Sequence, residues 1–234
     1  MNLITRGGIE FLAVLLGITV SLWVDDLRND ATLREMEITA IEVIRADMIA
    51  DTLTLYRRIE QNEKRLKNAL SLVHYINEDT TLDDDEVIKG LNGLIYFNPF
   101  QVNKSNYVSM IANAGKNIIQ NHEVSIALSN IYETGHTHAL STREIRLQMA
   151  YEYIEDFMSA GGFDKIPGRF NAQIEKLGTQ RKMFDKIIEN KNFLARISSH
   201  IGSMSWMSGR YKSLLNRYRS TLIIVNDYFD EISS

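Results

Sequence analysis

The chain has 234 residues and a formal net charge of −4, with 44% hydrophobic and 24% charged residues. This composition predicts a folded chain rather than a disordered one, long enough for a membrane anchor and one further domain. No excess of basic residues is present to neutralise phosphates, so we expect no nucleic-acid partner. The chain contains no cysteine, which excludes disulfides, thiolate nucleophiles and cysteine metal sites.

The distribution of helix-breaking residues predicts an all-α fold. Only two prolines occur, Pro99 and Pro167, and the stretch from Ile18 to Lys89 contains neither proline nor glycine. Both residue types break or weaken helices, so a long run without them favours helix. The alternation of apolar and polar residues that marks strands is not found.

The first element in chain order is an apolar segment that predicts a membrane anchor. Ile9 to Val24 is a run of sixteen residues with one charge, Glu10. At about 1.5 Å per residue it covers roughly 24 Å of the ~30 Å hydrocarbon core. Trp23 stands where an interfacial aromatic anchor would lie. We therefore predict an N-terminal membrane anchor over residues 1–26 and a helical extramembrane domain over residues 27–234.

A cleaved signal peptide and a buried helix of a soluble protein are the alternative interpretations of this segment. Glu10 interrupts the apolar region that a signal peptide needs, and no small-x-small cleavage site follows it. We expect a single uncleaved span with the short N-terminal tail inside and the domain outside.

One face of the predicted span combines charge with small residues. At about 100° per residue, Arg6, Glu10, Ala13, Gly17 and Ser21 fall on the same side of a helix. Rows of small residues allow two helix backbones to approach closely in lipid. The sequence therefore predicts a helix–helix interface formed by Glu10, Ala13, Gly17 and Ser21. It also predicts that Arg6 and Glu10, one turn apart, form a charge pair at the membrane edge.

Two long helices with heptad seams are predicted, one after the anchor and one at the end of the chain. Both seams have spacings of three, four or seven residues, which is typical of paired helices. The first comprises Ile41, Ile44, Met48, Leu55, Ile59, Leu66, Leu70 and Val73. The second comprises Ile197, Ile201, Met204, Tyr211, Leu215, Tyr218, Leu222, Val225, Phe229 and Ile232. An antiparallel pairing of the two would form an elongated bundle, a coiled coil with Ile232 near the membrane.

Shorter helices are predicted between the two seams. Asp83 to Asp85 is expected to begin a helix, where the helix dipole favours acidic residues, rather than to bind a divalent cation. Ser105 is the predicted N-cap of the next helix and Gly115 its C-terminal stop. Helices are also expected over 122–133 and 140–160, with a turn at 134–138 and a loop at 161–170.

No catalytic motif is found, and we predict no enzymatic activity, no catalytic residue and no cofactor. The chain contains no G-x-S-x-G elbow, no phosphate-binding loop and no G-x-G-x-x-G. His136 and His138 form an H-x-H pair in the predicted turn, but no third metal ligand is fixed by its spacing. We therefore predict no metal site.

Three blocks of the sequence carry a resemblance; they are "GIEFLAVLLGITVSLWVDDLRND" (8–30), "NYVSMIANAGKNIIQNHEVSIALSNIYE" (106–133) and "KNFLARISSHIGSMSWMSGRYKSLLNRYRSTLIIVNDYFDEI" (191–232). Together they resemble a bacterial family of single-span membrane proteins known only as a domain of unknown function. The "WVDD" boundary departs from the "NNWNE" that is usual in the family. The resemblance implies a helical membrane protein and no activity. With the orientation expected for the span, we predict a protein of the bacterial inner membrane with its C-terminal domain in the periplasm.

Three functions are compatible with these features. The favoured hypothesis is a non-enzymatic, membrane-anchored accessory or assembly protein that contacts lipid and binds itself or a membrane complex. The second is an oligomer that conducts ions or protons through Glu10, because intramembrane carboxylates are functional candidates. The third is an extracytoplasmic helical bundle that senses a ligand.

Overall fold

The computed structural model describes most of the chain. The backbone is described for residues 3–77, 80–95, 98–115, 118–135, 143–149 and 191–234, and at positions 137, 141, 151, 152, 155 and 189. Within the helices, side chains are not described for residues 3–13, 88, 92, 95, 113, 114 and 191–193. The predicted loop at 161–170 and the pair His136 and His138 lie outside the described residues.

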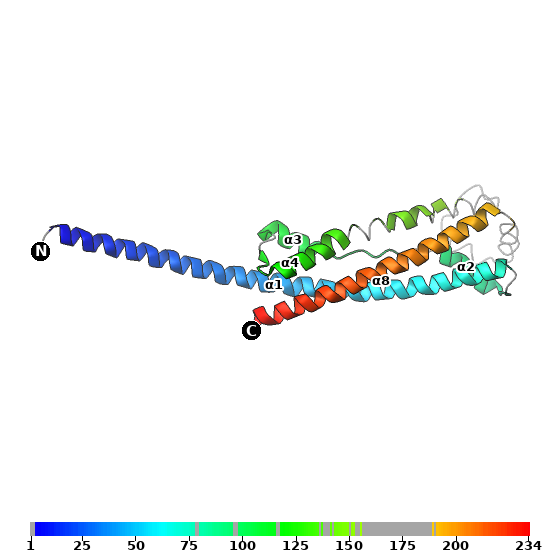
Figure 1. Ribbon diagram of the computed structural model, residues 1–234, viewed down its shortest axis with the longest axis horizontal. Coiled ribbons are helices and arrows are strands. Elements are labelled where there is room, and N and C mark those ends of the chain that lie inside the picture. The colour runs from blue at the N-terminus through cyan, green and yellow to red at the C-terminus, as the bar shows by residue number, and fades with distance from the viewer. Residues whose placement is uncertain are drawn as a thin grey trace.

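The described part of the chain is all-helical, and two long helices dominate it. α1 spans Leu3–Ile76 and α8 spans Lys191–Ser233. They run antiparallel and side by side, and the shorter helices pack along them (Figure 1). The predicted all-α class, the elongated bundle and its long first and last helices are thus confirmed for these residues.

The interface between α1 and α8 forms the main core. Residues predicted for both seams are buried within it, including Ile41, Met48 and Leu55 of α1 and Tyr218 and Val225 of α8. The direction of the pairing is fixed by its cross-helix contacts, since Glu37 meets Tyr228 and Asp51 meets Tyr218. The predicted antiparallel arrangement of the two seams is therefore correct.

The first seam was predicted wrongly at its C-terminal end. Leu70 is 41% exposed, whereas Ala69 and Leu72 are fully buried. The predicted seam and the structure agree through Leu66, which is partly buried, and differ at the next step. The buried stripe continues from Leu66 to Ala69, three residues on, and then to Leu72, whereas the prediction placed the next core position four residues on, at Leu70.

Local sequence explains where the short helices begin and end. α2 (Asp84–Ile95) begins with a capping box, in which the Glu86 amide donates to Asp83 Oδ1 (2.8 Å) and the Asp83 amide to Glu86 Oε2 (3.1 Å). The predicted capping role of this acidic stretch is confirmed. α3 (Ser105–Ala114) ends at Gly115, whose φ is 75°. Ser105 is the first helical residue and not the N-cap, so that prediction was one residue off.

The segment after α3 is helical for longer than predicted. α4 (His122–Ser129) is capped by Asn121, whose side chain accepts from the Val124 amide, and it continues as a π-helix, η2 (Asn130–Gly135). The predicted turn at 134–138 was therefore wrong at its start, because the helical backbone continues through Gly135. The wider turn brings both Ile131 and Tyr132 into the core.

α1 has two segments with different surroundings. Its paired segment, residues 37–76, contacts α8 along one side and is covered at its far end by α2. Its projecting segment, residues 3–33, extends beyond the end of α8 as a single helix (Figure 1). The C-terminus lies beside the point where α1 leaves the bundle, as the seam prediction requires.

Candidate functional site

The projecting segment exposes a dense set of apolar side chains. Each of the large hydrophobic residues described between positions 14 and 27 is between 41% and 63% exposed; they are Val14, Leu15, Leu16, Ile18, Val20, Leu22, Trp23, Val24 and Leu27. At about 100° per residue they point to all sides of the helix. A helix that is apolar all round is typical of a segment with lipid or protein on every side.

The residues predicted for the helix–helix interface lie partly in the described region. Gly17, Ser21 and Trp23 are exposed, and a Cβ added at Gly17 would meet no other atom within 4 Å. The side chains of Arg6, Glu10 and Ala13 lie outside the described residues. Among described residues, no helix is both long and apolar enough to cross a membrane, so the predicted span is not supported by the structure.

Two buried carboxylates connect α1 to the rest of the bundle. Glu37 is fully buried, and its Oε1 accepts from the Tyr228 hydroxyl (2.5 Å) and from the Gln120 amide (2.7 Å). Asp51 accepts from the Tyr218 hydroxyl (2.8 Å) and from the Asn103 amide (3.0 Å). Charge-assisted bonds of this kind are stronger than neutral ones, so each carboxylate fixes α8 and a connecting loop against α1.

The environment of Asp51 is unfavourable to its charge. Burial raises the pKa of Asp51, and the nearby Asp47 raises it further, although the bonds from Tyr218 and Asn103 act in the opposite direction. Asp47 in turn accepts from the side-chain amides of Asn103 (2.7 Å) and Asn106 (2.8 Å). The loop before α3 is therefore held on α1 by a cluster of acceptors on successive turns.

A pair of tyrosines lies next to this cluster. The rings of Tyr107 and Tyr132 stack with their centroids 4.6 Å apart. Burial and the adjacent Glu133, which accepts from the Tyr107 hydroxyl (3.1 Å), raise the pKa of Tyr107 to about 12. The Tyr132 hydroxyl is buried with no hydrogen-bond partner. Both phenols are neutral at physiological pH, because the pKa of each is raised. The two tyrosines therefore pack α3 against the α4–η2 segment, and neither is an activated base.

A buried histidine ties α8 to the far end of the bundle. His200 Nε2 lies 2.8 Å from the carbonyl of Leu94, an acceptor only, so the ring donates from this nitrogen. Burial, with a smaller contribution from Arg146, lowers the pKa of His200 to about 4. The ring is therefore neutral at physiological pH and acts as a structural donor.

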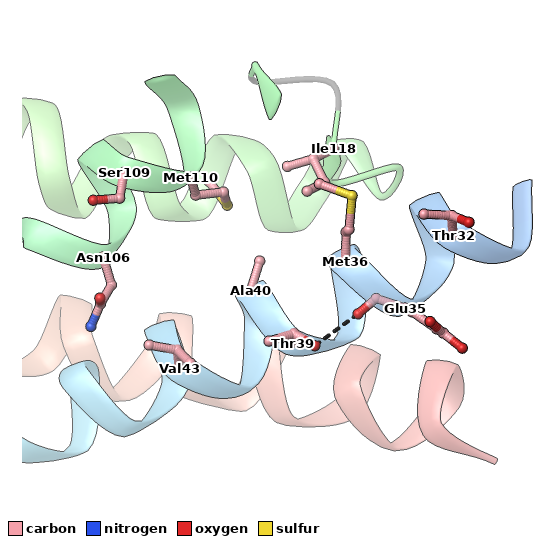
Figure 2. Close-up of a pocket in the computed structure, with 10 residues that line it drawn as sticks. All are labelled: Thr32, Glu35, Met36, Thr39, Ala40, Val43, Asn106, Ser109, Met110 and Ile118. Atoms are coloured by element: carbon pink, nitrogen blue, oxygen red, sulfur yellow. Dashed lines mark hydrogen bonds between the residues drawn. The ribbon is translucent and has the colours of Figure 1, made fainter. Parts of the chain in front are cut away.

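A pocket lies where the bundle meets the projecting segment. It has a volume of about 460 Å³ and is an open hollow between α1, α3 and Ile118 (Figure 2). Small-molecule sites commonly have volumes of ~300–1,000 Å³. No residue of this pocket was predicted as a site, because Ala40, Met110 and Ile118 come from separate parts of the chain that only the fold brings together.

No group of three or more His, Asp or Glu is placed to bind a metal ion within the described part of the chain. Comparisons of the chain with protein-family models, curated proteins and solved structures find no match. The resemblance to the single-span family therefore stays a prediction, and the function must be argued from the residues themselves.

Proposed function

We propose that the chain is a non-enzymatic helical protein anchored in the bacterial inner membrane by residues 1–26, with residues 27–234 in the periplasm. The projecting segment supports this proposal. Its described apolar side chains are exposed on every side, and residues 9–13 belong to the same apolar run in the sequence. A protein partner alone would need one apolar stripe, whereas lipid surrounds a helix completely.

The proposed mode of action is association with a second copy or with a membrane complex through the small-residue row. Gly17 and Ser21 interrupt an otherwise bulky surface, and no atom of the described residues lies within 4 Å of a Cβ placed at Gly17. At about 100° per residue, Ser21 lies on the side of α1 opposite Ile41 and Met48, which pack on α8. Two copies could therefore pair through this row without a clash between their α8 helices.

Vesicle flotation of the full chain tests the anchor. We expect the wild type to float with phosphatidylcholine vesicles and the double variant Leu16→Lys, Val20→Lys to remain in the soluble fraction, because each charge costs about 2.5–3.5 kcal/mol at the centre of a span. Ile223→Lys is the matched control, since Ile223 is 62% exposed on α8. If the double variant floats to the same extent as the wild type, the proposed anchor is wrong.

Native mass spectrometry of the full chain tests the association. Gly17→Ile places a bulky side chain on the small-residue row and should reduce the oligomer several-fold. Gly202→Ile is the control, because a Cβ at Gly202 on α8 also meets nothing within 4 Å. Orientation can be read separately, since a single cysteine introduced at Ser234 of this cysteine-free chain should react with an impermeant maleimide in intact spheroplasts.

A further inference from the structure

Two carboxylates lie one turn apart on the paired segment of α1, where it meets the loop before α3. Asn103 bonds both of them, because its backbone amide donates to Asp51 Oδ2 (3.0 Å) and its side-chain Nδ2 donates to Asp47 Oδ1 (2.7 Å). Asn106 donates to the second oxygen of Asp47 (2.8 Å), and Figure 2 shows its side chain reaching from α3 toward α1. The two acidic groups are therefore held within reach of a single residue.

The two negative charges have no ion-pair partner within the described part of the chain. The groups that bond Asp47 and Asp51 are amides and the hydroxyl of Tyr218, all of them neutral. The positions three and four residues away from either carboxylate carry no lysine or arginine. Burial, with a smaller contribution from Asp47, raises the pKa of Asp51, as expected for a charge without compensation.

A buried hydroxyl without a partner lies at the same place. Tyr132 of η2 is 2% exposed, and its hydroxyl oxygen has no hydrogen-bond partner. Burial and then the charges of Asp51 and Asp47 raise the pKa of Tyr132, so this hydroxyl lies near both carboxylates although it bonds neither. Leaving a buried polar group unpaired costs stability. A ligand held by the two carboxylates would also give this hydroxyl a partner.

The oxygen atoms and the charge select a hard divalent cation. An ionised carboxylate has about four acceptor sites, and the bonds to Asp47 and Asp51 leave at least one free on each. Calcium and magnesium ions take carboxylates, neutral oxygens and water as ligands, and an ion of charge two would balance the pair. Asn103 and Asn106 are exposed, so ions and water reach Asp47 from solvent.

We propose that Asp47 and Asp51 bind Ca²⁺ or Mg²⁺, with water completing the coordination and one such water bonded to the Tyr132 hydroxyl. The ion would fasten α1 to the loop before α3 and to η2. Two carboxylates make a weak site, so we expect a dissociation constant of ~10⁻⁴–10⁻³ M. The proposal departs from the expectation of no metal site, which was drawn from histidine spacing. It goes beyond the proposed function and does not depend on the anchor.

Terbium luminescence of the full chain in dodecyl maltoside, after removal of bound ions with EDTA, tests the site. Tb³⁺ takes the oxygen ligands that Ca²⁺ takes, and it emits when a nearby tyrosine is excited. We expect Ca²⁺ or Mg²⁺ to displace it at about 0.1–1 mM, and the ion that acts at the lower concentration is the preferred one. No displacement by either ion at about 10 mM, tenfold above the weakest expected constant, would overturn the proposal.

Matched variants locate the ion. Asp47→Asn and Asp51→Asn each remove one charge and keep an acceptor, and each should weaken Ca²⁺ binding about tenfold or more. The control is the double variant Asp227→Asn, Asp230→Asn, which neutralises an exposed acidic pair three residues apart on α8. Circular dichroism checks that each variant is folded. Wild-type affinity in both single variants, or an equal loss in the control, would contradict the site.

Melting temperatures test the hydroxyl of Tyr132. Ca²⁺ at about 10 mM should raise the melting temperature of the wild type by a few degrees, since an ion bound only to the folded chain stabilises it. Tyr132→Phe removes the unpartnered hydroxyl, so in EDTA it should be at least as stable as the wild type and should gain less from Ca²⁺. An equal gain in Tyr132→Phe would contradict the part assigned to its hydroxyl, and an equal gain in Asp51→Asn would overturn the proposal. Vesicle flotation of these variants should match the wild type, so failure of this inference is distinguishable from failure of the anchor.

Discussion

The paired and projecting segments of α1 belong to one helix but present opposite surfaces. In the paired segment Ile41, Met48 and Leu55 form a buried stripe at 0% exposure, whereas Arg57 and Glu60 on another side are exposed. In the projecting segment, Val14, Leu16 and Leu22 are all at least 60% exposed. Most helices gain their stability from packing one apolar face. The apolar side chains of the paired segment are therefore buried by other helices of the same chain. Those of the projecting segment would need lipid or another molecule to cover them.

The largest expected effect comes from making the same substitution in both segments. Leu55→Ala removes a fully buried side chain and should lower the free energy of unfolding of the bundle by about 2–5 kcal/mol. Leu16→Ala, at 63% exposure, should change it by less than about 0.5 kcal/mol. Chemical denaturation followed by circular dichroism in one detergent measures both. Equal losses would show that the projecting segment packs on the bundle.

Acid should weaken the far end of the bundle through His200. Its pKa is lowered from 6.5 to about 4, so the unfolded chain binds the proton first, and stability present above pH 6.5 is lost as the pH falls toward 4. The loss approaches about 3 kcal/mol at pH 4. His200→Gln retains a donor for Leu94 and should flatten this part of the stability–pH profile. His122→Gln, at an exposed position, should leave it unchanged.

Substitution of glycine by alanine should have a smaller effect on stability, and again one that differs between packed and exposed helix. A Cβ at Gly93 in α2 would lie 2.9 Å from the backbone oxygen of Arg65 in the paired segment. Gly93→Ala should therefore destabilise the bundle by about 1–2 kcal/mol after the gain in helix propensity is deducted. Gly17→Ala meets no atom within 4 Å and should cause no loss. The melting temperatures of the two variants measure this difference, and equal melting temperatures would contradict it.

The smallest effect is expected at a polar contact inside the paired segment. Asn62 is buried, and its Nδ2 donates to the hydroxyl of Ser208 and to the carbonyl of Met204 (3.0 Å). Ser208→Ala removes one of the two acceptors and should cost about 1 kcal/mol. Ser213→Ala, exposed on the same helix, is the control. A loss as large as that of Leu55→Ala would mean that the contact does more than satisfy Asn62.

Asn62 and Ser208 also show where sequence analysis reached its limit. Both predicted seams contained steps of seven residues, and a buried polar residue lies within each, namely Asp51 after Met48, Asn62 after Ile59 and Ser208 after Met204. An apolar pattern cannot include them, although the gaps were a signal that polar residues fill the missing positions. The helices themselves and their pairing were predictable because they depend on local periodicity and on the absence of helix breakers.

The pocket was not predictable for a different reason. Its floor is Met36, Ala40 and Val43, which follow ordinary helical spacing and carry no motif. Only the placement of α3 by the bonds from Asn103 and Asn106 to Asp47 turns this surface into a hollow. Those bonds join residues more than fifty positions apart, so no local sequence pattern predicts them.

The continuity of α1 has a mechanical consequence. Its 74 residues form one rod of about 110 Å, and the rod includes both the projecting segment and the pocket floor. Ser21, Thr32 and Thr39 are separated by eleven and seven residues, close to whole helical turns, so they lie along one side of the rod. A rotation of α1 near Ser21 would therefore also move the pocket floor, together with α3, which is bonded to α1 at Asp47. One continuous helix thus joins the exposed end of α1 to the pocket floor.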